Sequence, residues 1–345
     1  MKRREVGASQ WCLKMHAAFL SERSMSVKLG TVLSEPRPVT GGAVQGSVLG
    51  VLDHNIVLNN LDDDLLSIYV AKYIDDMTLI DTVDNSVPTV IDNSPSRPLH
   101  TINPEETQNA FNSICRRAAV KGLKINDQKT QLLSVSSGYY TTKAVIKDAS
   151  LNEIYSSPTL KMLGYTFSET PTVQAQLDYL MRKANKRLFL LLNFKRSGVP
   201  KDKLKDLYGT MNRYILEYTS NVYHPQLNKG QSNQLEKIQK RCLRIIYGYE
   251  HDYATLLNMS GLQTLEERRV NSFDKFTKNT AKNPKYNHWF PINPAERTGR
   301  NTNKYLEETA TGTRLYNSPI FSMRRHLNRT STLEQIDLTG FFNLP

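Results

Sequence analysis

Two adjacent acids, Asp75 and Asp76, are the residues of this sequence best suited to chemistry. They end the tetrapeptide Tyr73-Ile74-Asp75-Asp76, and apolar residues typical of strands flank it on both sides, which predicts two short strands with the acids between them. Asn-Gly or Asp-Gly would suit a plain tight turn better, and neighbouring carboxylates repel each other. Mg²⁺ removes that repulsion, because it prefers hard oxygen ligands and takes phosphates as further ligands. A solvated acidic turn is the alternative interpretation of the tetrapeptide alone.

The charge of the chain is divided between an acidic and a basic segment. The 345 residues include 45 Lys and Arg against 33 Asp and Glu, a net charge of +12. Residues 53–84 hold eight aspartates and one lysine, whereas residues 178–247 hold fifteen basic and five acidic residues. Metal-assisted phosphate chemistry needs this combination, since carboxylates hold cations and basic surfaces hold a polyphosphate backbone. An ordinary helical surface plus an acidic loop is the alternative.

Composition argues against several classes of protein. No apolar run approaches the roughly 20 residues of a membrane-spanning helix. The basic N-terminus is not followed by the apolar stretch of a secretory signal. The three cysteines, Cys12, Cys115 and Cys242, lie far apart, which argues against a disulfide scaffold and a structural zinc site. We therefore expect an intracellular protein, in the nucleus or the cytoplasm, that has no membrane partner.

Hydrophobic periodicity predicts an α+β chain whose second half is mostly helical. In the first half we expect helices around Trp11–Phe19, from Ser47 to Leu61 and over 105–121, and strands at 26–30, 67–83, 131–136, 143–147 and 160–167. Residues 84–104 are rich in Asn, Ser and Pro and predict a loop. In the second half we expect helices at 174–195, 202–219, 229–247 and 262–281, then an irregular tail after Asn283.

Four motifs follow one another along the chain. They are Gln45 to Leu61 (QGSVLGVLDHNIVLNNL), Tyr73 to Asp76 (YIDD), Gly122 to Thr130 (GLKINDQKT) and Leu163 to Tyr165 (LGY). Together they resemble the reverse transcriptase of non-LTR retrotransposons, whose segments read PQGSVLGPLLFNIYINDL, YADD, GLxINxxKT and LGY. Residues 216–246 and 314–320 resemble the thumb helices and the C-terminal stretch of that family. The shared order is more specific than any single motif.

The resemblance implies a partial right-hand polymerase palm, an antiparallel sheet with packed helices, over residues 1–168. A helical, basic thumb over 169–250 and a C-terminal extension over 251–345 would follow. The implied reaction adds dNTPs to a DNA primer 3′ end on an RNA template, with two Mg²⁺ ions. Asp75 and Asp76 would be the catalytic metal ligands. The resemblance assigns nucleotide or template binding to Gln45, Gly46, Ser47, Tyr73 and Lys129, the primer grip to Leu163 and Gly164, and contacts with the nucleic-acid backbone to Arg182, Lys183, Lys186 and Arg187.

Several of these residues have ordinary structural alternatives. Gly46 would let a ligand approach the backbone closely. Lys129 could equally be an exposed lysine at the end of a loop, Gly164 a strand-turn glycine, and the basic helices a solvated face. We expect the aromatic residues of those helices to lie in the core rather than to stack on bases; they are Tyr179, Phe189, Tyr208, Tyr214 and Tyr218.

The sequence departs from the family at the third metal ligand. The family's palm needs a further upstream aspartate in a pattern like DxxxAFD, and residues 1–44 contain none. We therefore expect the chain to begin after that strand and after the finger region, so that it has an incomplete metal site and little or no activity alone. Asp53 and His54 replace apolar residues, and an unpaired buried carboxylate is costly unless the two bond each other or lie exposed. Ile74 replaces a small residue and would crowd the primer terminus.

Two further possibilities stay open at this point. The chain could be a non-enzymatic, basic RNA- or DNA-binding remnant, whose binding would depend on salt and not on Asp75 or Asp76. It could also be an unselected gene fragment. The sequence does not identify a protein partner, the template or an oligomeric state.

Overall fold

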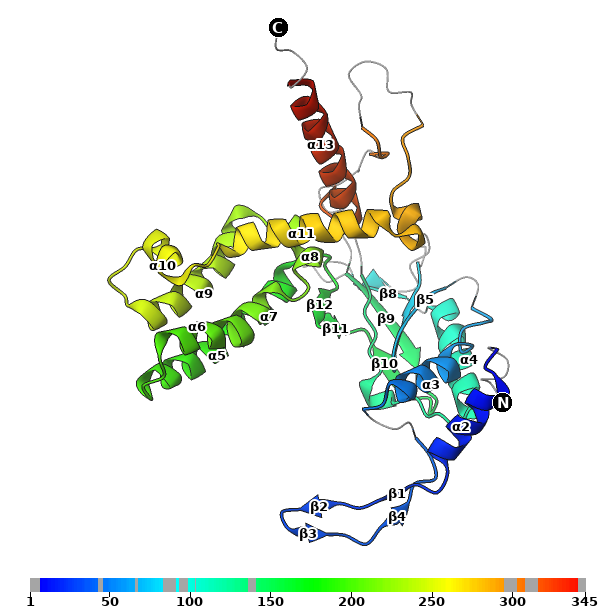
Figure 1. The fold of residues 1–345 in the computed structure, drawn as a ribbon. Coiled ribbons are helices and arrows are strands. Elements are labelled where there is room, and N and C mark those ends of the chain that lie inside the picture. Colours follow the sequence, from blue (N-terminus) through cyan, green and yellow to red (C-terminus); the bar gives the residue numbers. More distant parts are fainter. Residues whose placement is uncertain are drawn as a thin grey trace. The chain divides into compact units, whose positions relative to one another are not determined.

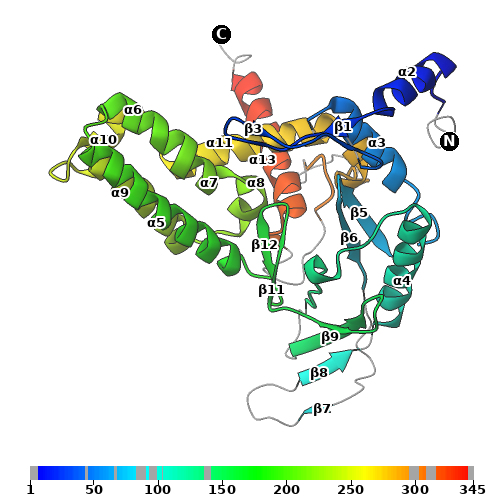
Figure 2. The ribbon, with the colours of Figure 1, turned by 90° about the horizontal axis from the view of Figure 1, so that it is seen from below.

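A computed structural model describes nine stretches of the chain: residues 7–42, 46–65, 68–82, 91–92, 99–102, 104–135, 141–294, 303–307 and 316–340. The chain forms two compact units. The described residues up to 134, together with 141–156, belong to the first unit, and residues 157–340 belong to the second. Figures 1 and 2 show strands and helices mixed in the first unit and helices dominating the second.

Three helices of the first unit begin as the sequence predicts. They are α2 (Gln10–Leu20), α3 (Val48–Leu58) and α4 (Glu105–Val120). The Ser47 hydroxyl caps α3 by accepting a hydrogen bond from the Gly50 backbone N–H at 2.9 Å. Helix α4 starts after Pro104 and has two glutamates in its first turn, where the helix dipole favours negative charge.

The strands of the first unit form three separate two-stranded ladders and one larger sheet. The antiparallel ladders pair β1 (Ser24–Met25) with β4 (Arg37–Pro38), β2 (Lys28–Leu29) with β3 (Val32–Leu33), and β5 (Tyr69–Tyr73) with β6 (Asp76–Ile80). The sheet has the order β10 (Glu153–Tyr155), β9 (Thr141–Lys147), β8 (Leu99–Ile102), β7 (Ile91–Asp92).

Two expectations for this sheet are wrong. Residues 84–104 contain strands β7 and β8 rather than loop alone, because pairing with β9 recruits a segment whose composition disfavours strands. The β8–β9 pairing is parallel, whereas a wholly antiparallel sheet was expected. The predicted strand at 131–136 is reduced, among residues 131–135, to a single bridge from Leu132 to Ser156.

The second unit begins with a hairpin and continues as helices. The hairpin pairs β11 (Thr159–Met162) with β12 (Tyr165–Ser168). The helices are α5 (Gln174–Arg196), α6 (Lys201–Leu207), a π-helix (Tyr208–Arg213), α7 (Tyr214–Glu217), α8 (Ser220–Tyr223), α9 (Lys229–Tyr247), α10 (Tyr253–Ser260), α11 (Leu265–Lys282) and α13 (Pro319–Gly340). The predicted single helix at 202–219 is therefore three elements, α10 was missed, and the tail contains a helix where irregular chain was expected. Whether residues 169–250 and 251–345 act as separate domains stays a prediction.

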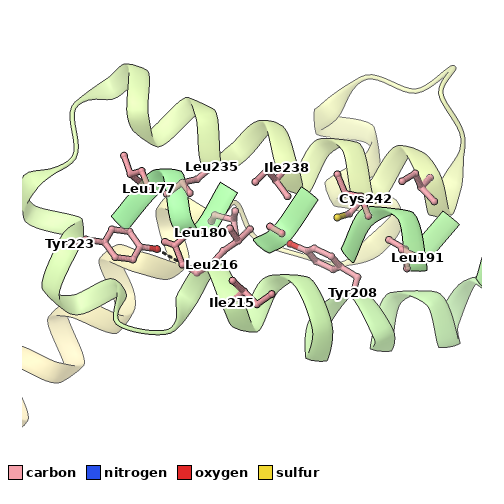
Figure 3. Packing of buried hydrophobic residues seen from close by; sticks show 14 of the residues in the cluster. Leu177, Leu180, Leu191, Tyr208, Ile215, Leu216, Tyr223, Leu235, Ile238 and Cys242 are labelled. Carbon is pink, nitrogen blue, oxygen red and sulfur yellow. Dashed lines mark hydrogen bonds between the residues drawn. The ribbon is translucent and has the colours of Figure 1, made fainter. Parts of the chain in front are cut away.

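Helices α5 and α9 supply much of the core of the second unit. Leu177 and Leu180 of α5 lie near Leu235 and Ile238 of α9, Leu191 lies further along α5 near Tyr208, and all of these residues are buried (Figure 3). With Ala184 and Leu188 of α5 and Cys242 of α9, these residues recur every three or four positions, which places them on one side of each helix. Burial of each such side chain is worth about 1.5–3 kcal/mol. This packing gives the second unit a rigid frame.

Two buried tyrosines satisfy their hydroxyls inside this core. The Tyr208 hydroxyl donates to the Gln239 side chain. The Tyr223 hydroxyl donates to the Leu216 carbonyl (Figure 3). Tyr208 is fully buried, as expected. Phe189, Tyr214 and Tyr218 are instead 62%, 59% and 46% exposed, so the expectation that they lie in the core is wrong.

Asp53 is accommodated differently from the expectation. Its carboxylate lies 2.9 Å from Nε2 of His16 on α2, so it is not an unpaired buried acid. The side chain of His54 lies outside the described residues.

No helix in the described stretches is both long enough and apolar enough to cross a membrane. All three cysteines are free thiols.

Candidate functional site

Most aspartates of residues 53–82 are engaged by their own chain. Asp53 pairs with His16, and Asp62 pairs with Lys72. Asp63 and Asp64 both pair with Arg117, and Asp81 accepts a hydrogen bond from Thr107. Asp75 and Asp76 differ. Both are exposed, and within the described residues neither carboxylate has an ion pair or a hydrogen-bond partner. The structure therefore leaves the motif acids available to an external ligand.

The two acids stand at the tip of the β5–β6 hairpin. Tyr73 pairs with Asp76, so the turn consists of Ile74 and Asp75, and Asp76 already belongs to strand β6. This corrects the expectation that both acids lie between the strands. Ile74 has a φ of 55°, in the left-handed region. That region costs an L-residue about 1–2 kcal/mol, and a β-branched residue is rarely found there. The tip is strained at the residue beside the acids.

Helix α4 ties the hairpin to α3. Thr107 in its first turn bonds Asp81 at the end of β6, at 2.8 Å. At the other end of α4, Arg117 donates to the Asn60 carbonyl at 2.8 Å and Lys121 donates to the Val57 carbonyl at 2.9 Å. The Lys72 ammonium of β5 reaches the Asn59 carbonyl at 2.8 Å. The base of the hairpin is therefore fixed while its tip stays open.

The carboxylate pair suits Mg²⁺ in donor chemistry, because both groups offer hard oxygens and no basic side chain competes for them among the described residues. The described residues contain no cluster of three His, Cys, Asp or Glu side chains that could hold a metal ion. A cation on Asp75 and Asp76 would therefore take its other ligands from water and phosphate, as Mg²⁺ does at many phosphate sites.

The other residues assigned to nucleotide or template lie on several separate elements. Gly46 has a φ of 81°, which explains the glycine, and an added Cβ would meet nothing within 4 Å. Ser47 caps α3, and Tyr73 is 58% exposed at the end of β5. Lys129 is exposed in a short 3-10 helix (Asp127–Lys129), and no contact among the described residues joins it to the acids. Gln45 lies outside the described residues.

The β11–β12 hairpin has a second strained tip. Leu163 and Gly164 have φ values of 48° and 83°, the pattern of a type I′ turn, which glycine favours. The Tyr218 hydroxyl donates to the Leu163 carbonyl at 3.1 Å. A Cβ at Gly164 would lie 2.5 Å from Cε1 of the Tyr218 ring. Gly164 is thus required both by its backbone angle and by the ring against it.

A buried glutamine also fastens this hairpin. The Gln176 side chain of α5 accepts a hydrogen bond from the Thr166 backbone N–H at 2.9 Å and donates to the Thr219 hydroxyl at 3.2 Å. Gln176 is fully buried, so its amide has no hydrogen bonds with water, and these two bonds take their place. The predicted primer-grip residues therefore sit on a hairpin held firmly by the helices of the second unit.

The predicted backbone-contact residues lie along α5. Arg182, Lys183 and Lys186 are exposed. Arg187 is half-buried, and its guanidinium donates to the Met211 carbonyl in the π-helix at 2.8 Å. It therefore has a structural role whatever else it contacts. Sequence reasoning missed Lys161, whose ammonium donates to the Tyr179 hydroxyl. Tyr179 itself is half-buried and packs against the core, close to the expectation for it. The four-residue spacing of Tyr179 and Lys183, which brings helix side chains together, was the available signal.

One comparison with known proteins finds a match for the first part of the chain. Residues 7–167 match the reverse transcriptase (RNA-dependent DNA polymerase) family. The matched segment runs from α2 into β12 and contains both strained hairpin tips. The chain has no match among curated proteins or among solved structures.

Proposed function

We propose that this chain takes part in RNA-directed DNA synthesis as the partial palm, thumb and C-terminal extension of a reverse transcriptase of the non-LTR retrotransposon type. The observation that carries the proposal is the state of Asp75 and Asp76. In a segment similar to reverse transcriptases, they are the acids of residues 53–82 that have no partner among the described residues. The motifs at 45–61, 122–130 and 163–165 support the non-LTR type.

Each unit has a proposed part in the reaction. Asp75 and Asp76 hold Mg²⁺, which when bound activates the primer 3′-hydroxyl and neutralises the triphosphate. Gln45, Gly46, Ser47, Tyr73 and Lys129 contact the incoming dNTP or the template base. Leu163 and Gly164 position the primer. The basic helices within 169–250, with Arg182, Lys183, Lys186 and Arg187, hold the backbone of the RNA–DNA duplex through counterion release.

We expect the 345-residue chain to extend primers weakly or not at all. Residues 1–44 contain no aspartate, and the described residues bring no third acid to the pair. Two-metal catalysis of phosphoryl transfer needs both ions fixed around the reacting phosphate. One pair of adjacent carboxylates holds them incompletely.

Primer extension on an RNA template, with dNTPs and Mg²⁺, tests this directly. Wild type should add few or no nucleotides, and Asp75→Ala should remove any addition that is seen. Asp63→Asn is the matched control, because it removes one exposed acid of the same segment outside the pair. Robust synthesis by wild type that Asp75→Ala abolishes would contradict the expected low activity of the chain but support the role of Asp75 in catalysis. Synthesis insensitive to Asp75→Ala would contradict the assigned role of the acids.

A non-enzymatic nucleic-acid-binding remnant is the second candidate, and the charge distribution favours it. Residues 178–247 carry fifteen basic and five acidic residues, which suffices for salt-dependent binding without catalysis. The two candidates differ in their response to nucleotide. In a polymerase, dNTP with Mg²⁺ should tighten duplex binding, and Asp75→Asn should remove that gain. In a remnant, neither the nucleotide nor the substitution should alter the affinity.

A further inference from the structure

Two lysines from different elements converge on one tyrosine in the second unit. The Lys161 ammonium of β11 donates to the Tyr179 hydroxyl at 2.8 Å, and the Lys183 ammonium of α5 donates to the same oxygen at 3.4 Å. Both ammonium groups also lie over the Tyr179 ring, at 4.6 and 5.6 Å from its centre. The hydrogen bond from Lys161 and then that from Lys183 lower the pKa of Tyr179. We call these three side chains the Lys-Tyr-Lys cluster.

The cluster has no acidic counterpart among the described residues. The two ammonium groups lie close to the same oxygen atom and therefore repel each other. Among the described residues, neither lysine forms an ion pair that would offset this repulsion. Asp178, the acid next to Tyr179 on α5, forms no ion pair with either lysine, and its carboxylate accepts a hydrogen bond from the Gln174 amide at 2.8 Å. Convergent and unneutralised cations are what a site for an anion requires.

The donors that remain match a phosphate group in number and kind. The Tyr179 oxygen accepts from both lysines, which leaves its own O–H to donate outward. Each ammonium has further N–H groups beyond the one that it uses. A tetrahedral oxyanion can accept from all three groups at once, and its charge offsets the repulsion between the lysines.

We propose that the Lys-Tyr-Lys cluster binds one phosphodiester group of a nucleic-acid backbone. This inference rests on the proposed function and adds Lys161 and Tyr179 to its binding surface. The surroundings favour a polynucleotide over a small anion, because Arg182 and Lys186 continue the exposed basic surface along the same helix. Lys161 also lies on the hairpin whose tip is Leu163-Gly164, so a phosphate here would be held between that hairpin and α5.

Fluorescence anisotropy with a labelled RNA–DNA duplex, measured over a series of salt concentrations, tests the site in the full chain. Lys161→Ala and Lys183→Ala should each weaken binding roughly three- to tenfold at low salt. Tyr179→Phe keeps the packing of the ring and should weaken binding about threefold through loss of the hydroxyl. The Lys161→Ala/Lys183→Ala double variant should lower the slope of log affinity against log salt by about one in total, because one phosphate is lost. Lys275→Ala, which removes an exposed charge of α11, is the control and should bind as wild type.

The outcomes separate the site from the proposed function. Salt-dependent wild-type binding with cluster variants equal to Lys275→Ala overturns the site and leaves the function standing. If the slope of log affinity against log salt falls by about two in the double variant, the two lysines bind separate phosphates, which contradicts the proposal of one shared phosphate. Absence of any duplex binding by wild type contradicts the function and the site together. Vesicles of phosphatidylserine and phosphatidylcholine form a second arm, and vesicle binding that needs Lys161 as much as duplex binding does would overturn the choice of nucleic acid.

Discussion

The two hairpins β5–β6 and β11–β12 have similar turns but opposite surroundings. Each has a two-residue tip whose first residue is a branched apolar side chain at positive φ, Ile74 in one and Leu163 in the other. The tip at Leu163 is braced, because Tyr218 bonds its carbonyl and packs against Gly164. No described side chain hydrogen-bonds to the tip at Ile74. Strain of this kind persists only where the surrounding structure or a function maintains it.

The hairpins also differ in the charge that they leave without a partner. Asp75 and Asp76 keep two negative charges at the first tip, whereas Lys161 and Lys183 keep two positive charges beside the second hairpin. Cations would stabilise the first arrangement and phosphates the second. A polymerase substrate supplies both, which is consistent with the proposed roles of β5–β6 in metal binding and of β11–β12 in backbone binding.

The largest expected effect is at the braced tip. Gly164→Ala should lower the free energy of unfolding by about 2 kcal/mol, from about 1 for the left-handed backbone and about 1 for displacing the Tyr218 ring from its hydrogen bond. Gly198 is the matched control in the same unit, since its φ is 80° and an added Cβ would meet nothing within 4 Å. Gly198→Ala should cost only the backbone part, about 1 kcal/mol. Equal losses in differential scanning calorimetry would mean that Tyr218 does not brace the turn.

The next effect has the opposite sign and lies at the unbraced tip. Ile74→Gly should raise the free energy of unfolding by about 0.5–1 kcal/mol, because relief of the left-handed strain exceeds the entropy that glycine loses on folding. Ile80→Gly is the control in the same hairpin, at a similarly exposed strand position. It should lower stability, since glycine weakens a strand. A destabilising Ile74→Gly in urea unfolding would contradict strain at the tip.

An effect of similar size isolates the hydroxyl of the brace. Tyr218→Phe removes the hydrogen bond to the Leu163 carbonyl and should cost about 0.5–1 kcal/mol. Tyr214→Phe makes the same change one helical turn earlier, on a ring 5.8 Å from that of Tyr218, and should leave stability unchanged. If both variants melt at the wild-type temperature, the brace depends on ring packing alone.

The smallest effect compares acids within one segment. Asp75→Asn should raise stability by a few tenths of a kcal/mol, because it relieves repulsion from Asp76 and breaks no contact among the described residues. Asp62→Asn should lower stability by a similar amount, because it weakens the pair with Lys72. Opposite signs in parallel urea titrations are the expected result, and a loss of stability in both variants would contradict the difference between these acids.

Much of the fold and of the candidate site follows from local signals in the sequence. Ser47 predicts the start of α3, and the leucine spacing predicts α5 and α9 with nearly the observed ends. The YIDD tetrapeptide predicts the exposed acid pair. Strand β8 was missed because its partner β9 lies far along the chain, and β7 was missed with it because β7 pairs only with β8 within this sheet. Local patterns do not encode such long-range pairing.

Long-range contacts also explain the side chains that were misjudged. Tyr218 looks like a core residue by type, but it is exposed and its hydroxyl bonds the Leu163 carbonyl of the β11–β12 hairpin. Asp53 looked like an unpaired acid because its partner, His16, lies on another helix. In each case the deciding contact joins elements whose proximity only the folded chain establishes.

Divalent-cation binding by Asp75 and Asp76 is tested most directly by titrating the full chain with Mn²⁺, which replaces Mg²⁺ and is followed by electron paramagnetic resonance, with and without a dNTP. Wild type should bind Mn²⁺ more tightly when the dNTP is present, since phosphates complete the ligand set. The Asp75→Asn/Asp76→Asn variant should lose this binding, while Asp63→Asn should keep it. Identical Mn²⁺ binding by wild type and by the double variant would contradict a metal site at the hairpin tip.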